Sequence, residues 1–217
     1  MEFFMTNRFA IILLALVAIF LGIFFISKGK SSDSNGSNSA QASSHTQGAG
    51  KKGVTLVEYG DFQCPACTAY HPLIKQVVEK YKEDITFQFV NYPLVSIHPN
   101  AMAAHRAAEA AHKQNKYWEM HDLLYERHDE WATSSTPTTF FEGYATQLSL
   151  NIDQFKQDSS SSSVNDIINA DIKKGQALRL QATPTFYIND KKITDNPQDA
   201  AGFEKLIQDA INEKNKQ

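Results

Sequence analysis

The chain's only two cysteines, Cys64 and Cys67, lie at a point where the sequence pattern changes from strand to helix. The preceding segment, 54–59, is rich in β-branched and apolar residues, which predicts a buried strand. Thiols at this spacing can close a small disulfide and open it again. Unpaired N–H groups and the dipole at a helix start would favour a thiolate at Cys64. Because no other cysteine exists to form a structural bridge, the pair predicts exchange chemistry.

The first 53 residues have a different composition from the rest of the chain. An apolar run extends from Phe9 to Ile26, close to the length of about 20 residues that a spanning helix needs. We therefore predict a transmembrane anchor over residues 9–27, preceded by a cytoplasmic N-terminus over 1–8. A cleaved signal peptide is the alternative, but no Ala-x-Ala cleavage site follows the run. Residues 28–53 are rich in serine and glycine and predict a flexible linker.

Two indications about the orientation of this anchor oppose each other. Arg8 precedes the span while Lys28 and Lys30 follow it, so the charge distribution slightly disfavours an exterior C-terminus. Stable dithiol oxidation, however, belongs outside the reducing cytosol. We give the chemistry more weight and expect a single-pass cell-membrane protein with an extracytoplasmic catalytic domain.

The rest of the chain predicts a β-α-β unit, a long helical block and a β-β-α unit. This order indicates an α/β fold: a thioredoxin-like core over residues 54–97 and 181–217, with a helical domain inserted at 98–180. The predicted strands are 54–59, 85–91, 185–189 and 191–194. The predicted helices are one that contains the cysteine pair and ends near 81, then 100–115, 116–130, 136–148, 164–180 and 199–214, with a short capped turn over 151–155.

Several motifs resemble the DsbA family of thiol-disulfide oxidoreductases, in particular its membrane-anchored branch. They are the segment Val57–Cys67, the segment 91–94 with His98-Pro99 after it, the helical stretch 105–124, and Ala182-Thr-Pro-Thr-Phe-Tyr-Ile-Asn189. The resemblance covers most of residues 54–217. A lone CxxC is a weak signal, but a CxxC after a strand, combined with Thr-Pro-Thr-Phe before a late strand, is a strong one.

The resemblance implies a role for each residue around the pair. Cys64 would be the exposed nucleophile and Cys67 its buried partner, and together they would form the redox-active disulfide. The Thr183–Pro184 bond would be cis and would pack beside this disulfide, with the Thr183 backbone pairing with an extended substrate. Glu58 would be a buried acid that helps to move protons at Cys67.

The two residues between the cysteines, Pro65 and Ala66, would also contact substrate. The best-known family member has Pro-His at these positions. Alanine at position 66 removes a group that could stabilise the Cys64 thiolate, so we expect a less acidic Cys64 and a weaker oxidant than that relative. Thr183 is also found in isomerase-like relatives, which leaves the direction of exchange open.

The expected function is an exported oxidase that introduces disulfide bonds into extracytoplasmic proteins. Its partners would be reduced or unfolded exported proteins and, by analogy with the family, a quinone-linked membrane reoxidase of the DsbB or vitamin-K-epoxide-reductase type. No cofactor is expected, and a net charge of −3 gives no argument for nucleic acid. A disulfide reductase or isomerase on the same fold is the main alternative.

A metal-binding or redox-inactive binding module is the remaining alternative. The cysteines could form half of a zinc site with His71 as a third ligand, but closed structural sites want four ligands and the sequence has no second matched pair. His98, His105 and His112 recur every seven residues, a helical rise of about 10.5 Å, which is too long for all three to share one ion. We therefore expect no metal ligands, and capping, packing or solvated roles for these histidines.

Overall fold

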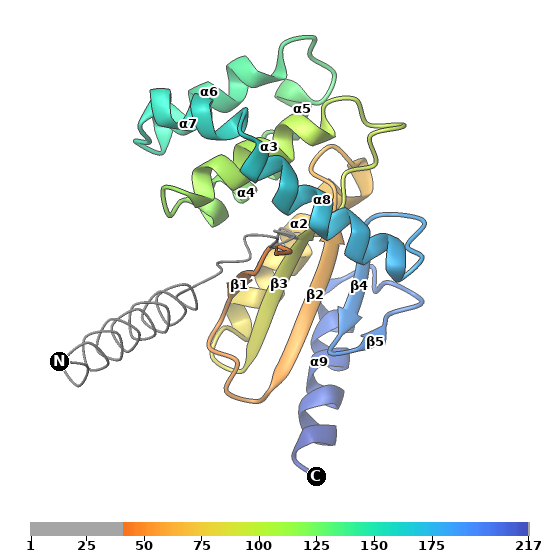
Figure 1. Ribbon diagram of the computed structural model, residues 1–217. Helices are drawn as coiled ribbons and strands as arrows, with labels where there is room; N and C mark the ends of the chain where they lie inside the picture. The colour runs from red at the N-terminus through yellow and green to blue at the C-terminus, as the bar shows by residue number, and fades with distance from the viewer. Residues whose placement is uncertain (1–40, 217) are drawn as a thin grey trace, which may run out of the picture. The chain divides into compact units, whose positions relative to one another are not determined.

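The computed structural model describes residues 41–216, and Figure 1 shows how their helices and strands are arranged. The predicted cytoplasmic N-terminus (1–8) and transmembrane anchor (9–27) lie outside the described residues, so both stay predictions. Within 41–216, no helix is long and apolar enough to cross a membrane.

A five-stranded mixed sheet forms the centre of the described chain, with the strand order β1-β3-β2-β4-β5. The central strands β2 (Val54–Gly60) and β3 (Ile85–Asn91) run parallel. They are joined through α2 (Pro65–Lys80), the kind of crossover that a parallel pair requires. On the other side, β4 (Thr185–Ile188) pairs antiparallel with β2, and β5 (Lys191–Lys192) pairs with β4 at the edge. This is the predicted thioredoxin-like core.

Strand β1 (His45–Gln47) corrects the predicted extent of the linker over 28–53. It adds an antiparallel edge strand to the sheet, with His45 opposite Phe89 of β3. The His45 side chain is buried, and its Nε2 atom lies 2.7 Å from Oε1 of the buried Glu109. Contacts with residues far along the chain therefore order a segment whose composition alone indicates a flexible linker.

Helices cover both faces of this sheet. α2 packs with α9 (Ala200–Lys214) on the face that is turned away from the viewer in Figure 1. α8 (Ser162–Ala177) contacts β3 and crosses the front of the sheet. Between the sheet and α9, the ring centres of Phe186 and Phe203 lie 5.1 Å apart, and both side chains are fully buried. The sheet thus contributes one side of a continuous aromatic core.

The segment between β3 and β4 forms the predicted helical block, above the sheet in Figure 1. α3 lies at its centre and contacts α4, α6, α7 and α8. Its buried face consists largely of alanines, whose small side chains let the neighbouring helices approach closely. Besides α8, the helices of the block are α3 (Ala101–His112), α4 (Tyr117–Glu126), α5 (His128–Trp131), α6 (Pro137–Gln147) and α7 (Ile152–Ser159).

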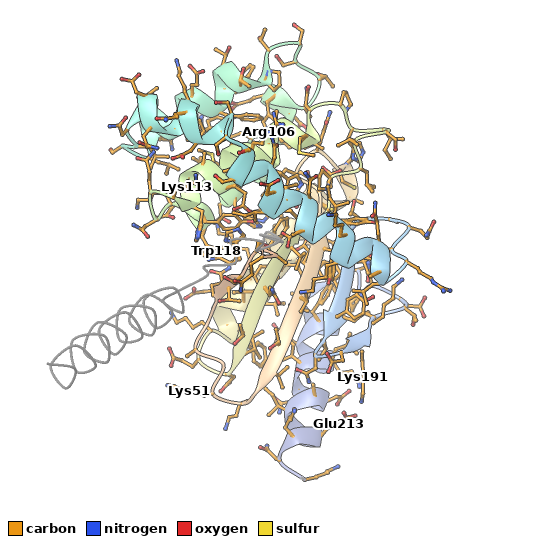
Figure 2. All side chains as sticks on the ribbon, in the orientation of Figure 1. Lys51, Arg106, Lys113, Trp118, Lys191 and Glu213 are labelled. Atoms are coloured by element: carbon orange, nitrogen blue, oxygen red, sulfur yellow. The ribbon has the colours of Figure 1, made fainter. Side chains whose placement is uncertain are left out.

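Polar side chains, labelled in Figure 2, tie this block together and join it to the sheet edge. The Arg106 Nε atom donates to Asn165 Oδ1 at 2.7 Å, which links α3 to α8. The indole Nε1 of Trp118 donates to the Thr46 carbonyl at 3.3 Å, which links α4 to β1. The helical block and the edge strand therefore support each other.

Candidate active site

The cysteine pair lies at the start of α2, directly after the turn that follows β2. Cys64 is the N-cap residue, and Pro65 follows in the first turn of the helix, where its missing N–H leaves no bond unmade. Both cysteines are free thiols. Cys64 is only 7% exposed and is thus buried rather than exposed as the resemblance implies, while Cys67 is fully buried. Of the two sulfurs, that of Cys64 is still the more accessible.

Several donors favour a thiolate at Cys64. The hydrogen bond from the Cys67 thiol has the largest effect, and Thr183 and the backbone N–H groups of Cys67 and Ala66 add to it. Together they lower the pKa of Cys64 to about 5, although burial opposes the change. The Thr183 hydroxyl is buried and has no other hydrogen-bond partner, so it is free to donate to this sulfur. At neutral pH the Cys64 side chain is therefore an anion.

The thiol of Cys67, in contrast, favours its protonated form. Burial raises the pKa of the Cys67 thiol well above its usual range, and the bond to Cys64 and the negative charge of Glu58 raise it further. The backbone N–H of Asp61, which donates to its sulfur at 3.5 Å, only partly offsets these effects. The pair is therefore asymmetric, with an ionised thiol at the helix start and a protonated thiol below it.

The Thr183–Pro184 peptide bond is cis, which confirms the expectation drawn from the resemblance. It lies directly before β4, and the Thr183 carbonyl oxygen is 3.4 Å from the Cys64 sulfur. Two motifs separated by 119 positions in the sequence thus meet at one site. Pro65 and Ala66 are exposed next to this sulfur, where a bound substrate can contact them.

Glu58 lies inside the protein, on β2, with only 3% of its surface exposed. The strand register places it between Phe89 of β3 and Phe186 of β4. Burial and, to a smaller extent, the charge of Cys64 raise the pKa of Glu58 to about 8. A carboxyl group with this pKa can accept and release a proton close to neutral pH, as a general acid or base must.

Asp61 holds the turn that carries the cysteines, a function that we did not predict from the sequence. Its Oδ1 atom accepts from the Gln63 backbone N–H at 2.8 Å, and its Oδ2 atom accepts from the Leu94 N–H at 2.8 Å. The same Oδ2 atom lies 2.7 Å from Nδ1 of His98. The fully buried carboxylate thus joins the turn after β2 to the loop after β3. An aspartate directly after a strand is a turn signal that could have indicated this role.

A cavity of about 230 Å³ has Glu58 in its wall. His71 of α2, His121 of α4 and the adjacent Asp122 also line it. Burial lowers the pKa of His71 to about 4 and also lowers that of His121, so both rings are neutral near pH 7. His71, which we considered as a third ligand beside the cysteines, is therefore grouped with a histidine and an aspartate from another helix.

The three histidines that recur every seven residues have separate surroundings. His98 contacts the carboxylate of Asp61, and the Nδ1 atom of His105 lies 2.6 Å from Oδ1 of Asn91 inside the core. His112 is exposed on α3. The expectation of separate packing and solvated roles is therefore confirmed.

Sequence comparisons identify relatives of two kinds. A family model described as Thioredoxin matches residues 40–209. A protein named Na(+)/H(+) antiporter NhaA 1 from Mycolicibacterium gilvum is 35% identical over 168 residues, which are 76% of this chain and 26% of that protein. A probable disulfide bond formation protein D from Bacillus cereus is 29% identical over 145 residues, or 63% of this chain and 65% of that protein. The chain thus spans about a quarter of the first relative and less than two thirds of the second.

A comparison of structures gives the same fold. The crystal structure of oxidised BdbD from Bacillus subtilis superposes with a TM-score of 0.68 at 24% sequence identity, and the match covers 80% of this chain and 97% of that chain. At this identity the likeness shows the fold. The name of the antiporter describes a much longer protein, and ion transport is not inferred for this chain.

Proposed function

The chain belongs to the thioredoxin family, and we propose that it is a thiol-disulfide oxidoreductase of the DsbA type that donates its Cys64–Cys67 disulfide to protein substrates. The asymmetry of the cysteine pair carries this proposal. The pKa of Cys64 is lowered to about 5 while that of Cys67 is raised well above its usual range. Such a pair has one sulfur that leaves readily as a thiolate and one that takes up a proton.

The first step is attack of a substrate thiolate on Cys64 in the oxidised enzyme. The bond between the two enzyme sulfurs breaks, and a bond forms between Cys64 and the substrate sulfur. The electron pair goes to Cys67, which becomes a thiolate in a buried site that strongly favours the protonated form. Glu58, with its pKa raised to about 8, is the group that we assign to deliver this proton.

The second step releases the oxidised substrate. A second substrate thiolate attacks the substrate sulfur of the mixed disulfide, and Cys64 leaves as a thiolate. The substrate has then lost two electrons and gained a disulfide, and the enzyme holds both electrons as its dithiol. The stabilised thiolate of Cys64 favours this direction, because it makes Cys64 a good leaving group and lowers the free energy of the reduced enzyme.

The proposed setting is the outer side of the cell membrane. The apolar run over 9–27 would anchor the chain, and its catalytic domain would act on reduced or unfolded exported proteins. Reoxidation of the dithiol needs an electron acceptor, and we assign it to a quinone-linked membrane protein of the DsbB or vitamin-K-epoxide-reductase type.

A single-turnover reaction tests this function. The oxidised full-length protein is mixed with an equal amount of a reduced, unfolded protein substrate, with no other oxidant present. We expect the substrate to lose thiols as the enzyme gains them, in equal amounts, and a Cys64→Ser variant to transfer nothing. If the oxidised wild-type protein leaves the substrate reduced, the proposed oxidase function is wrong.

A further inference from the structure

The cavity beside Glu58 holds a second group of chemically versatile side chains. His71 follows Cys67 by one turn of α2, and His121 and Asp122 come from α4. One ligand atom from each of the three lies within 4.8 Å of the others. None of these three residues takes part in the thiol exchange described above.

Two ring nitrogens in this group have no hydrogen-bond partner among residues 41–216. The Nε2 atoms of His71 and His121 are both buried and unpaired, and the two residues are 7% and 3% exposed. A buried polar atom without a partner is unfavourable, because it has lost its hydrogen bonds to water and gained none in return. A ligand in the cavity that accepts a lone pair from a neutral imidazole would remove this cost.

The distances around Asp122 suit a metal ion. Its Oδ1 atom lies 3.7 Å from Nε2 of His71 and accepts from Nδ1 of His121 at 3.1 Å, which leaves the lone pair of the His121 ring on its unpaired Nε2 atom. With bonds of about 2.1 Å to each ligand, a tetrahedral zinc ion separates its ligand atoms by roughly 3.4 Å. The 3.7 Å between Asp122 Oδ1 and His71 Nε2 is close to this value, and one ligand atom from each of the three residues lies within 4.8 Å of the others.

Lys75 fixes the orientation of the carboxylate. Its Nζ atom lies 2.6 Å from Oδ2 of Asp122 and 2.7 Å from Oε1 of Glu126. The lysine therefore binds Oδ2 of Asp122, and the Oδ1 atom lies next to the two imidazoles. Hydrogen-bonded carboxylates of this kind are common where aspartate ligates a metal.

We propose that His71, His121 and Asp122 form a binding site for Zn²⁺, with the open cavity supplying room for water as a fourth ligand. Two imidazoles and one carboxylate are a zinc ligand set that leaves one position free. This site is separate from the cysteine pair and does not depend on the oxidase function.

Zinc binding to the full-length Cys64→Ser/Cys67→Ser protein tests the proposal, because this variant lacks both thiols, which could otherwise bind the metal themselves. We expect about one Zn²⁺ per chain, in competition with a chromophoric chelator. A His71→Phe change, which keeps an aromatic ring in the site, should weaken binding by about 100-fold or more, beyond the 10- to 100-fold typical of supporting residues. Asp122→Asn should weaken it in the same way, and His112→Gln, an exposed histidine on α3, should leave it unchanged.

Cobalt provides a second readout, since Co²⁺ in a tetrahedral site shows strong visible absorption bands. We expect these bands in the cysteine-free protein and their loss in both ligand variants. If His71→Phe fails to fold, as judged by circular dichroism, Asp122→Asn alone decides. The proposal is overturned if the cysteine-free protein binds no Zn²⁺, which would assign any zinc in the wild type to the thiols. It is also overturned if Asp122→Asn binds Zn²⁺ as tightly as its parent.

Discussion

Replacing Glu58 with glutamine should change how the stability of the reduced protein depends on pH. The carboxyl group is buried in β2, and its pKa rises from 4.5 to about 8 on folding. Between these two values the folded state holds a proton that the unfolded state has released. Wild-type stability is therefore fully present below about pH 4.5 and falls as the pH rises towards about 8. Glutamine has nearly the same shape but does not titrate.

The size of the effect follows from the pKa change. Each pH unit in this interval is worth about 1.4 kcal/mol, so the rise from 4.5 to about 8 corresponds to about 5 kcal/mol. The Glu58→Gln variant should have nearly wild-type stability at the acidic end and be more stable by several kcal/mol near pH 8. The lowered pKa of Cys64 also makes stability depend on pH, but it does so in both proteins and largely cancels in their difference.

Urea unfolding of the two reduced proteins, at a series of pH values between about 5 and 8, measures this difference. Glu213→Gln is the matched control, because Glu213 lies on the surface of α9, where it forms an ion pair with Lys191 (Figure 2). Its difference from wild type should be small throughout. If the difference in unfolding free energy between Glu58→Gln and the wild type changes with pH as little as that of the control, Glu58 is not a buried carboxyl group with a raised pKa. The same variant should also turn over more slowly, since it cannot deliver a proton to Cys67.

Three further outcomes are expected. Cys64→Ser should abolish exchange, whereas Cys67→Ser should accumulate mixed disulfides with substrates, which non-reducing gels detect. A Cys67→Ser protein that traps no substrate would contradict the role of Cys67 as the resolving thiol. Thiolate absorbance of the reduced wild type should titrate near pH 5, and Ala66→His should lower that midpoint, because a nearby positive charge stabilises the anion; an unchanged or higher midpoint counts against the electrostatic argument. Asn91→Ala should lower the free energy of unfolding in urea by about 3 kcal/mol, because the Asn91 amide donates to two buried carboxylates that would lose this donor. A decrease of less than about 1 kcal/mol would mean that water replaces the amide.

The fold could be predicted from the sequence wherever local periodicity decides the structure. The strands predicted at 54–59 and 85–91 follow from such patterns. The predicted start of α8, at residue 164, is too late, because the helix begins at Ser162 and is capped by the Ser161 hydroxyl, which accepts from the Val164 N–H. β1 could not be predicted in this way. Its residues are polar, and the contact of His45 with Glu109 joins positions far apart in the chain. Burial of that kind leaves no periodic signal.

The residues of the candidate site likewise differ in whether local sequence predicts them. Spacing identified Cys64 and Cys67, since two thiols at a helix start need only local structure to interact. The resemblance supplied the cis bond before Pro184. The unpaired Thr183 hydroxyl that can stabilise the Cys64 thiolate became visible only when the fold brought the two together. The grouping of His71 with residues of α4 likewise depends on the packing of two helices that are remote in the sequence.

The reduction potential of the full-length protein, measured against a series of glutathione redox buffers, decides whether its disulfide readily accepts electrons from substrate thiols or its dithiol readily donates electrons to substrate disulfides. A stabilised Cys64 thiolate predicts a value at or above about −180 mV, towards the about −120 mV of the strongly oxidising family member. A value at or below about −250 mV, near the about −270 mV of thioredoxin, would contradict the oxidase assignment and indicate a reductase.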